Sequence, residues 1–191
     1  FIPKSTKLVC INGSHEEIEL NRAADFCLLS DPGVFLDTLS NLKKNNKWNL
    51  DKNWFDENKN KKNEWVNKSL KNLEVEAEEA KKNGGKIHPL QLSLDVQDVM
   101  SEKDWLVIDG GNTHFWSEIA INIAGAKGKK LGGILHPGTF SMLGVGVSFA
   151  LSAKNNNPNS NVILISGDGA FLSGGMSIET AFFENKPIVV V

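Results

Sequence analysis

The feature that most restricts the fold of this 191-residue chain is a pattern in its second half, where continuous apolar runs end in glycine-rich loops. The run at residues 105–108 leads into Asp-Gly-Gly at 109–111, and the run at 162–165 leads into Ser-Gly-Asp-Gly at 166–169. A strand that is apolar at every position is buried on both faces, as in parallel sheets covered by helices. Helical patterns separate the runs, so the sequence predicts an α/β fold with a doubly wound parallel sheet.

The first 85 residues predict a smaller α/β unit. Residues 7–11 and 26–29 are apolar runs typical of buried strands, and Asp31 with Pro32 predicts the start of a helix that continues to about Leu42. The rest of this unit, residues 43–85, is expected to connect it to the next one. Its Asn- and Lys-rich part, residues 43–62, predicts a solvated linker whose tryptophans pack onto another surface, and residues 63–83 predict a charged helix that ends at Gly84-Gly85.

We therefore expect a domain boundary near residue 85, with one unit at 1–85 and a second at 86–191. Helices of the second unit are predicted at residues 90–100, 113–124, 143–153 and 176–183, and a short further strand at 132–135. The last apolar run, residues 187–191, predicts a buried strand. Because native proteins rarely end inside a strand, both ends of the chain are expected to be cut.

The composition is that of an ordinary globular protein, with 40% hydrophobic residues, 23% charged residues and a net charge of −2. This balance gives no electrostatic basis for binding nucleic acid or anionic lipid. No apolar run approaches the roughly 20 residues that cross a bilayer. Cys10 and Cys27 lie in apolar surroundings without metal-type spacing. Buried, reduced thiols in a cytoplasmic protein are therefore expected.

The two glycine loops are where a parallel sheet binds ligands, because they follow the carboxyl ends of strands. Glycine lets backbone N–H groups approach an anion, and a following helix N-terminus favours negative charge. Asp168, between Gly167 and Gly169, has a carboxylate free to bind a hard cation. Mg²⁺ prefers one or two protein oxygens together with phosphate oxygens, so these loops suit a diphosphate with Mg²⁺. A plain turn with Asp168 as a helix cap is the alternative, and neither loop matches the dinucleotide or nucleotide-phosphate glycine motifs.

Four stretches of the second half follow one another in a recognisable order. They are Gly-Asn-Thr-His-Phe-Trp at 111–116, Ser-Met-Leu-Gly-Val-Gly at 141–146, Gly-Asp-Gly-Ala-Phe at 167–171 and a helix and strand pattern at 176–188. Through them, residues 104–191 resemble the C-terminal cofactor domain of the thiamine-diphosphate-dependent superfamily that includes acetolactate synthase, benzoylformate decarboxylase and benzaldehyde lyase. Residues 7–39 resemble the middle domain of the same superfamily more weakly. The resemblance implies a middle domain followed by a truncated thiamine-diphosphate-binding domain.

The resemblance also implies roles for individual residues. Gly111, Asn112 and Thr113 would contact the diphosphate, Asp168 would be a magnesium ligand, and Gly167, Gly169 and Ala170 would belong to the cofactor loop. Leu143 would support the bent thiamine. The main chain near Ser141 would accept the hydrogen bond of the aminopyrimidine. His114 stands beside this site, either facing substrate or making a structural hydrogen bond, and His136 is a second candidate for the same cleft. No catalytic residue is expected in this chain, because the activating glutamate belongs to the N-terminal domain of such enzymes.

The full protein is expected to be an enzyme that decarboxylates a 2-keto acid and that assembles as a homodimer or homotetramer. The first expectation is an acetolactate synthase-like carboligase, which joins two pyruvate units with loss of CO₂. A non-joining decarboxylase or an aldehyde lyase is the alternative, because Asn112-Thr113 replaces the usual Gln-His. FAD or ADP is held by the middle domain of some relatives, but residues 1–85 show no FAD-contacting motif. A non-catalytic α/β binding domain and a nucleotide-binding regulatory domain are the hypotheses of another class.

Overall fold

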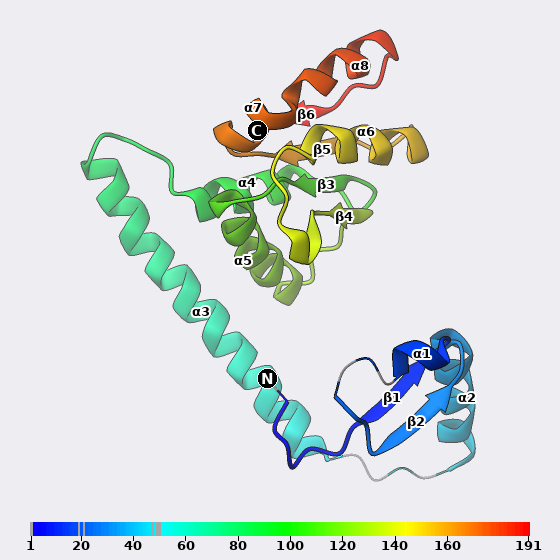
Figure 1. The fold of residues 1–191 in the computed structure, drawn as a ribbon. Coiled ribbons are helices and arrows are strands. Elements are labelled where there is room, and N and C mark those ends of the chain that lie inside the picture. Colours follow the sequence, from blue (N-terminus) through cyan, green and yellow to red (C-terminus); the bar gives the residue numbers. More distant parts are fainter. Residues whose placement is uncertain (1, 19, 21, 47, 49–50) are drawn as a thin grey trace. The chain divides into compact units, whose positions relative to one another are not determined.

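The computed structural model describes residues 2–18, 20, 22–46, 48 and 51–191, and it shows an α/β protein with two parallel sheets (Figure 1). Contacts within the chain divide it into two compact units, residues 1–54 and residues 55–191. Among the described helices, none combines the length and the apolar character that a bilayer crossing requires. The predicted α/β class is confirmed.

The first unit pairs β1 (Val9–Asn12) with β2 (Phe26–Leu29) in parallel, with α1 (His15–Ile18) and α2 (Pro32–Asn45) beside them. Asp31 caps α2 by accepting a hydrogen bond from the Val34 N–H at 3.0 Å, which confirms the predicted helix start. The expectation of two buried thiols is wrong, because Cys27 is exposed and Cys10 is half-buried. The reason is that the β1–β2 sheet has only two described strands, so both are edges.

The predicted linker at residues 43–62 is wrong from Lys52 onward, where the long helix α3 (Lys52–Lys82) begins. Asp51 starts the helix by accepting from the N–H groups of Asn53 and Trp54 at 3.0 and 3.3 Å. The Asn- and Lys-rich composition predicted a linker, but Lys and Glu have good helix propensity and favour a helix here. Residues 47, 49 and 50 of the predicted linker lie outside the described residues.

The second unit contains a four-stranded parallel sheet in the order β4-β3-β5-β6. Its strands are β3 (Trp105–Ile108), β4 (Gly133–Leu135), β5 (Val162–Ile165) and β6 (Val189–Val190). Its helices are α4 (Pro89–Val99), α5 (Asn112–Ala126), α6 (Gly146–Asn156), α7 (Asp168–Gly174) and α8 (Ile178–Phe183), with the 3₁₀ turns η1 (Gly138–Phe140) and η2 (Gly175–Ser177).

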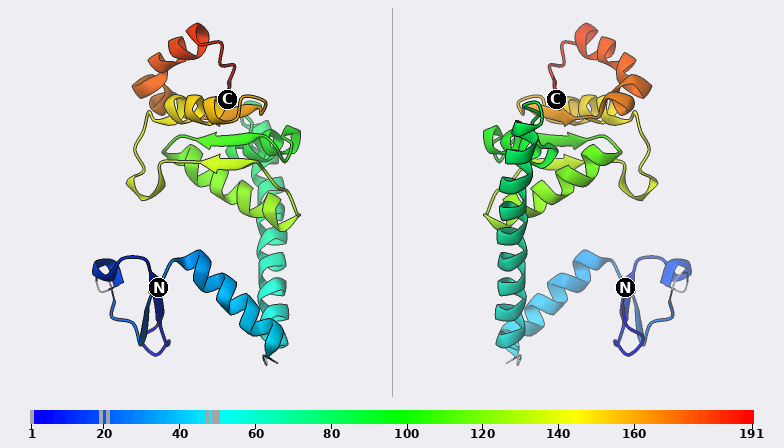
Figure 2. Two further views of the ribbon diagram at one scale, coloured as in Figure 1. Left: turned by 90° about the vertical axis from the view of Figure 1, so that its right-hand side faces the viewer. Right: turned by 90° about the vertical axis from the view of Figure 1, so that its left-hand side faces the viewer.

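Both faces of this sheet are covered, as its apolar strands predict. Val107 and Leu164 pack with side chains of α6 on one face, whereas Ile108 and Ile165 pack with side chains of α4 on the other. Figure 2 shows α6 and α5 on opposite sides of the strands. This alternation of two fully buried faces is the doubly wound arrangement expected from the sequence.

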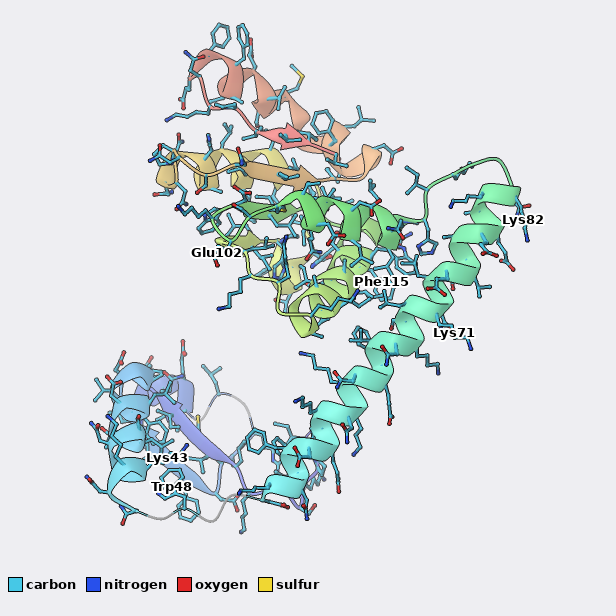
Figure 3. The ribbon with its side chains drawn as sticks, turned by 180° about the vertical axis from the view of Figure 1, so that it is seen from behind. Lys43, Trp48, Lys71, Lys82, Glu102 and Phe115 are labelled. Atoms are coloured by element: carbon cyan, nitrogen blue, oxygen red, sulfur yellow. The ribbon has the colours of Figure 1, made fainter. Side chains whose placement is uncertain are left out.

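A third layer is formed by α3, which packs on α4 and α5 through an apolar stripe that includes Val66 and Leu73. His88 joins the layers, because its Nδ1 accepts from the Leu90 N–H at the start of α4 and its Nε2 lies 2.8 Å from Glu76 Oε2 on α3. In Figure 3, Lys71 and Lys82 mark the opposite, solvent-facing side of α3, and both side chains are exposed. The predicted domain boundary near residue 85 falls within this second unit and stays a prediction.

Asp104 joins the starts of β3 and β5. Its carboxylate accepts from the Ser101 N–H at 2.7 Å and from the N–H and side-chain amide of Asn161 at 3.1 and 3.0 Å. The residue is 5% exposed. Burial acts to raise the pKa of Asp104, but the hydrogen bonds from Ser101 and Asn161 outweigh it and hold this pKa below its usual value.

We predict that Asp104→Asn lowers the free energy of unfolding by about 1–3 kcal/mol, because the amide must turn an N–H toward Ser101 or Asn161. Chemical denaturation at neutral pH measures the loss, with exposed Asp98→Asn as the control. Since the folded pKa is lowered, the stabilisation is present above the unfolded pKa of about 3.9 and disappears as the pH falls through the folded value. Equal stability of Asp104→Asn and wild type at neutral pH would contradict this assignment.

Candidate functional site

The candidate site lies where the order of the strands reverses. The chain passes from β3 to β4 on one side and continues with β5 and β6 on the other, so the connections diverge between β3 and β5. The two loops after these strands are neighbours, because the Asp109 N–H donates to the Ile165 carbonyl at 3.0 Å. In an open parallel sheet, a ligand-binding crevice forms at this reversal, beyond the carboxyl ends of the strands.

The loop after β3 presents the start of α5 to this crevice. Gly111 has φ +81° and ψ −155°, a conformation that side chains rarely adopt, and no side chain caps the helix there. Asn112 is exposed and Thr113 is half-buried in the first turn. An uncapped helix N-terminus carries free N–H groups and a positive dipole end, which together favour an anion.

The loop after β5 lies against the first loop. A Cβ on Gly167 would be 3.2 Å from the Thr113 hydroxyl oxygen, so the two predicted cofactor segments meet. Asp168 begins α7 and is exposed, and within the described part of the chain it has no hydrogen-bond or ion-pair partner. A Cβ on Gly169 would have open space around it, whereas Ala170 is buried. The carboxylate of Asp168 is therefore available to a cation at the crevice.

A third segment, from His136 to Val145, borders the first loop. The Leu143 side chain lies over Gly110, where an added Cβ would be 2.6 Å from the Leu143 Cδ2 atom. Leu143 is 49% exposed. Ser141 is exposed and has φ +48°, which is rare for a residue other than glycine. The residues with predicted thiamine contacts thus stand at the surface beside the diphosphate loop.

Asp109 holds this third segment in place. Its buried carboxylate accepts from the N–H groups of Gly144 at 3.1 Å and Gly146 at 2.9 Å, and also from Gly110 at 2.7 Å. The predicted helix start at residue 143 is wrong, because these bonds keep residues 143–145 as a loop and α6 begins at Gly146. No role was predicted for Asp109 from the sequence. Its position directly after a buried strand, with Gly144 and Gly146 downstream, is the signal that could have revealed it.

A cleft of about 220 Å³ opens between these loops and α4. It is lined by Asn112, Thr113, Trp116, Ser166 and Val191, among others. A larger hollow of about 580 Å³ lies between α3 and α5, and its lining includes Trp65 and Phe115, the latter labelled in Figure 3. That hollow has no residue of either glycine loop in its lining, whereas the strand-end cleft has Asn112, Thr113 and Ser166 but neither Asp168 nor Leu143.

His114 and His136 are close to each other but outside the lining of this cleft. Their ring centroids are 4.9 Å apart, and both Nε2 atoms approach Glu118 Oε1, at 3.2 and 4.0 Å. From the sequence, each histidine was predicted separately and Glu118 was given no role. The spacing of four residues between His114 and Glu118, which places both on one face of a helix, could have revealed the pair. The predicted substrate-side position of His114 stays a prediction.

The fold and the crevice define a cofactor-binding α/β domain of the parallel, doubly wound class. Comparison with known families makes this specific. Residues 109–191 match the family described as "Thiamine pyrophosphate enzyme, C-terminal TPP binding domain". The match covers less than half of the chain, so it is residues 109–191, with both glycine loops, that resemble the cofactor-binding domain of this family.

The curated relatives include enzymes with two kinds of name. The catabolic acetolactate synthase of Raoultella terrigena is 33% identical over 95 residues, which is 50% of this chain and 16% of that protein. The 2-hydroxyacyl-CoA lyase 2 of Homo sapiens is 30% identical over 105 residues, which is 55% of this chain and 16% of that protein. The chain therefore matches only about a sixth of the length of these relatives.

A solved structure from Mycobacterium smegmatis, whose name places it among thiamin diphosphate-dependent enzymes, has a similar fold. The TM-score is 0.63 at 15% sequence identity, and the match covers 99% of this chain and 32% of the other. At this identity the likeness concerns the fold, and it extends over both units.

We predict that Asp109→Asn loosens the segment that carries Ser141 and Leu143. The amide has only one acceptor oxygen, so its NH₂ group would face a backbone donor such as the Gly146 N–H and a hydrogen bond would be lost. The free energy of unfolding should fall by about 1–3 kcal/mol, and amide hydrogen exchange at Gly144 and Gly146 should accelerate. Exposed Asp98→Asn is the matched control. Unchanged exchange at both glycines would show that the Asp109 carboxylate does not hold this segment.

Proposed function

We propose that this chain is part of an acetolactate synthase-like enzyme that uses thiamine diphosphate and Mg²⁺ to decarboxylate a 2-keto acid and join the product to a second one. The single observation that carries the proposal is the position of Asp168. Its exposed carboxylate, which has no hydrogen-bond or ion-pair partner among the described residues, stands at the strand reversal, next to the start of α5, which no side chain caps. A carboxylate beside an anion-binding helix end suits a metal ion that bridges protein and diphosphate.

The surrounding residues fit this cofactor. Gly111, Asn112 and Thr113 would hold the diphosphate at the start of α5, and Asp168 would bind Mg²⁺. Gly169 leaves open space on the other side, where its N–H and that of Ala170 would face the phosphate. These assignments combine the geometry of the two loops with the family resemblance.

The third segment would position the thiamine itself. Leu143 packs over Gly110 while half of its surface stays exposed, so it offers an apolar support next to the proposed diphosphate site. The Ser141 carbonyl lies 3.3 Å from a Cβ built on Gly110, and it would accept the hydrogen bond of the aminopyrimidine. In this arrangement the Asp109 hydrogen bonds determine where Leu143 and Ser141 stand relative to the first loop.

When bound, thiamine diphosphate supplies the nucleophilic carbon and the electron sink for decarboxylation, and the protein supplies binding, orientation and electrostatics. The residues of this chain would bind and orient the cofactor. The glutamate that activates such cofactors would come from another domain, so these 191 residues alone are expected to be inactive. We further propose that residues 1–85 belong to a middle domain and residues 86–191 to the cofactor domain.

Assembly into a homodimer or homotetramer is part of the proposal. Leu172, Met176, Phe182 and Phe183, from α7, η2 and α8, are between 74% and 82% exposed. Monomeric proteins rarely leave so many large apolar side chains in contact with water on neighbouring elements. Burial of these side chains against a second subunit, or against another domain of the same subunit, would remove them from water.

A 2-hydroxyacyl-CoA lyase is the second candidate, and it refines the expected aldehyde-lyase alternative. The human 2-hydroxyacyl-CoA lyase 1 is 39% identical over 61 residues, which is 30% of this chain and 11% of that protein. The identity of the acetolactate synthase match is lower but extends over more of the chain. The two candidates share the cofactor and differ in substrate.

We predict that Asp168→Asn weakens Mg²⁺-dependent binding of thiamine diphosphate by at least about tenfold, because a metal ligand loses its charge. Titration calorimetry on the complete protein measures this affinity with and without Mg²⁺. Glu102→Gln is the matched control, because this exposed acid precedes β3 and stands at the opposite edge of the sheet (Figure 3). Equal affinity of Asp168→Asn and wild type would remove Asp168 from the site.

The complete protein, incubated with pyruvate, thiamine diphosphate and Mg²⁺, should form acetolactate, which proton NMR identifies against a control without cofactor. Acetaldehyde as the product would favour the non-joining decarboxylase. Turnover of a 2-hydroxyacyl-CoA without turnover of pyruvate would favour the lyase. Failure to bind the cofactor at all would contradict both enzyme candidates and return the domain to a binding or regulatory role.

A further inference from the structure

The side chains of His114, Glu118 and His136 form a compact group, here called the histidine–glutamate cluster. His114 and Glu118 are on adjacent turns of α5, and His136 directly follows β4. One imidazole nitrogen from each histidine and one carboxylate oxygen all lie within 4.8 Å of one another. Two separate elements therefore bring three potential metal ligands to one point.

We propose that the histidine–glutamate cluster binds a divalent transition-metal ion, with Zn²⁺ as the best match. Two imidazoles and one carboxylate are a ligand set for Zn²⁺, whereas Mg²⁺ prefers oxygen ligands only. The cluster is thus chemically different from the proposed magnesium position at Asp168. The cation would sit between α5 and the segment after β4.

The distances suit a tetrahedral ion after a small movement. Zinc bonds of about 2.0–2.1 Å place tetrahedral ligand atoms roughly 3.3 Å apart. His114 Nε2 and Glu118 Oε1 are already 3.2 Å apart. The second contact, His136 Nε2 to Glu118 Oε1, is 4.0 Å and must shorten. The nitrogens of the two histidines, which lie within 4.8 Å of each other, must also come to about 3.3 Å. His136 belongs to an exposed segment, so its ring can make this adjustment at little cost in packing.

The burial of the cluster fits a three-ligand site. The His114 side chain is only 17% exposed, which anchors one ligand within the protein. Glu118 and His136 are 43% and 38% exposed, so water has access to the fourth position. Before metal binding the three groups carry one negative charge when both imidazoles are neutral, and a divalent ion offsets it.

Protons must rearrange when the ion binds. In the structure the Gly138 N–H donates to His136 Nδ1 at 3.2 Å, which leaves the His136 proton on Nε2. Likewise, the contact of His114 Nε2 with Glu118 suits a proton on that nitrogen. Coordination through Nε2 moves each proton to Nδ1, with no net release, and the Gly138 N–H turns to water. This exchange is possible because Gly138 is exposed.

Metal binding would have a structural consequence. His136 is five residues before Ser141, so an ion shared with α5 would fix the near end of the segment that also carries Leu143. Asp109 fixes the far end through Gly144 and Gly146. The effect of the metal ion on thiamine positioning rests on the proposed function, but the metal site itself does not.

The test is a competition between the protein and a chromophoric chelator for Zn²⁺ at pH 7.5, without thiamine diphosphate or substrate. Wild type should bind one equivalent more than His136→Ala, and Glu118→Gln and His114→Ala should weaken that equivalent more than tenfold. His15→Ala, on the exposed surface of the first unit, is the matched control and should bind as wild type does. Circular dichroism checks that each variant is folded. His136→Ala should disturb the fold least, because His136 lies in an exposed segment.

Replacement of Zn²⁺ by Co²⁺ adds a spectroscopic test, since a tetrahedral site gives intense visible absorption bands that should be lost in Glu118→Gln. Metal affinity should also fall in acid, because protons compete with the ion for its ligand atoms. Equal zinc stoichiometry and affinity in wild type and all three cluster variants would overturn the proposal. Because no thiamine diphosphate is present, that outcome would leave the proposed enzyme function untouched.

Discussion

The buried carboxylate of Asp109 is the constraint on which the candidate site depends. It lies at the end of β3 and accepts hydrogen bonds from Gly110, Gly144 and Gly146, so one side chain joins a strand, its own loop and the start of α6. The segments that it joins are the ones proposed to hold the diphosphate and the thiamine ring. A charge at this depth is tolerated because its oxygens have three N–H partners.

Strand order supplies the second constraint. Because β3 and β5 are parallel neighbours with connections that diverge, both loops open at the same edge of the sheet. Glycines then let the segments approach closely, as at Gly174, where an added Cβ would collide with the Gly144 carbonyl. This contact joins α7, which begins at Asp168, to the segment that carries Leu143. The proposed magnesium position and the proposed thiamine support are thus connected through backbone contacts.

Much of the fold could be predicted from the sequence, because continuous apolar runs and caps are local signals. The strands at 105–108 and 162–165 and the Asp31 cap are at their predicted positions. The helical start at Lys52 was not predicted although its Asp51 cap is a local signal. The loop at Leu143 could not be predicted, because it depends on a contact distant in sequence, between Asp109 and the Gly144 N–H 35 residues away. For the same reason the loops of the candidate site could be named, but the meeting of His136 with His114 and Glu118 could not.

The most direct test of the account is a crystal structure of the complete protein with thiamine diphosphate and Mg²⁺. The diphosphate is expected at the start of α5, beside Gly111, Asn112 and Thr113, with the metal ion bound by Asp168. The thiamine ring is expected against Leu143. A diphosphate bound elsewhere, or a metal ion without Asp168 among its ligands, would contradict the central claim that the β3 and β5 loops form the cofactor site.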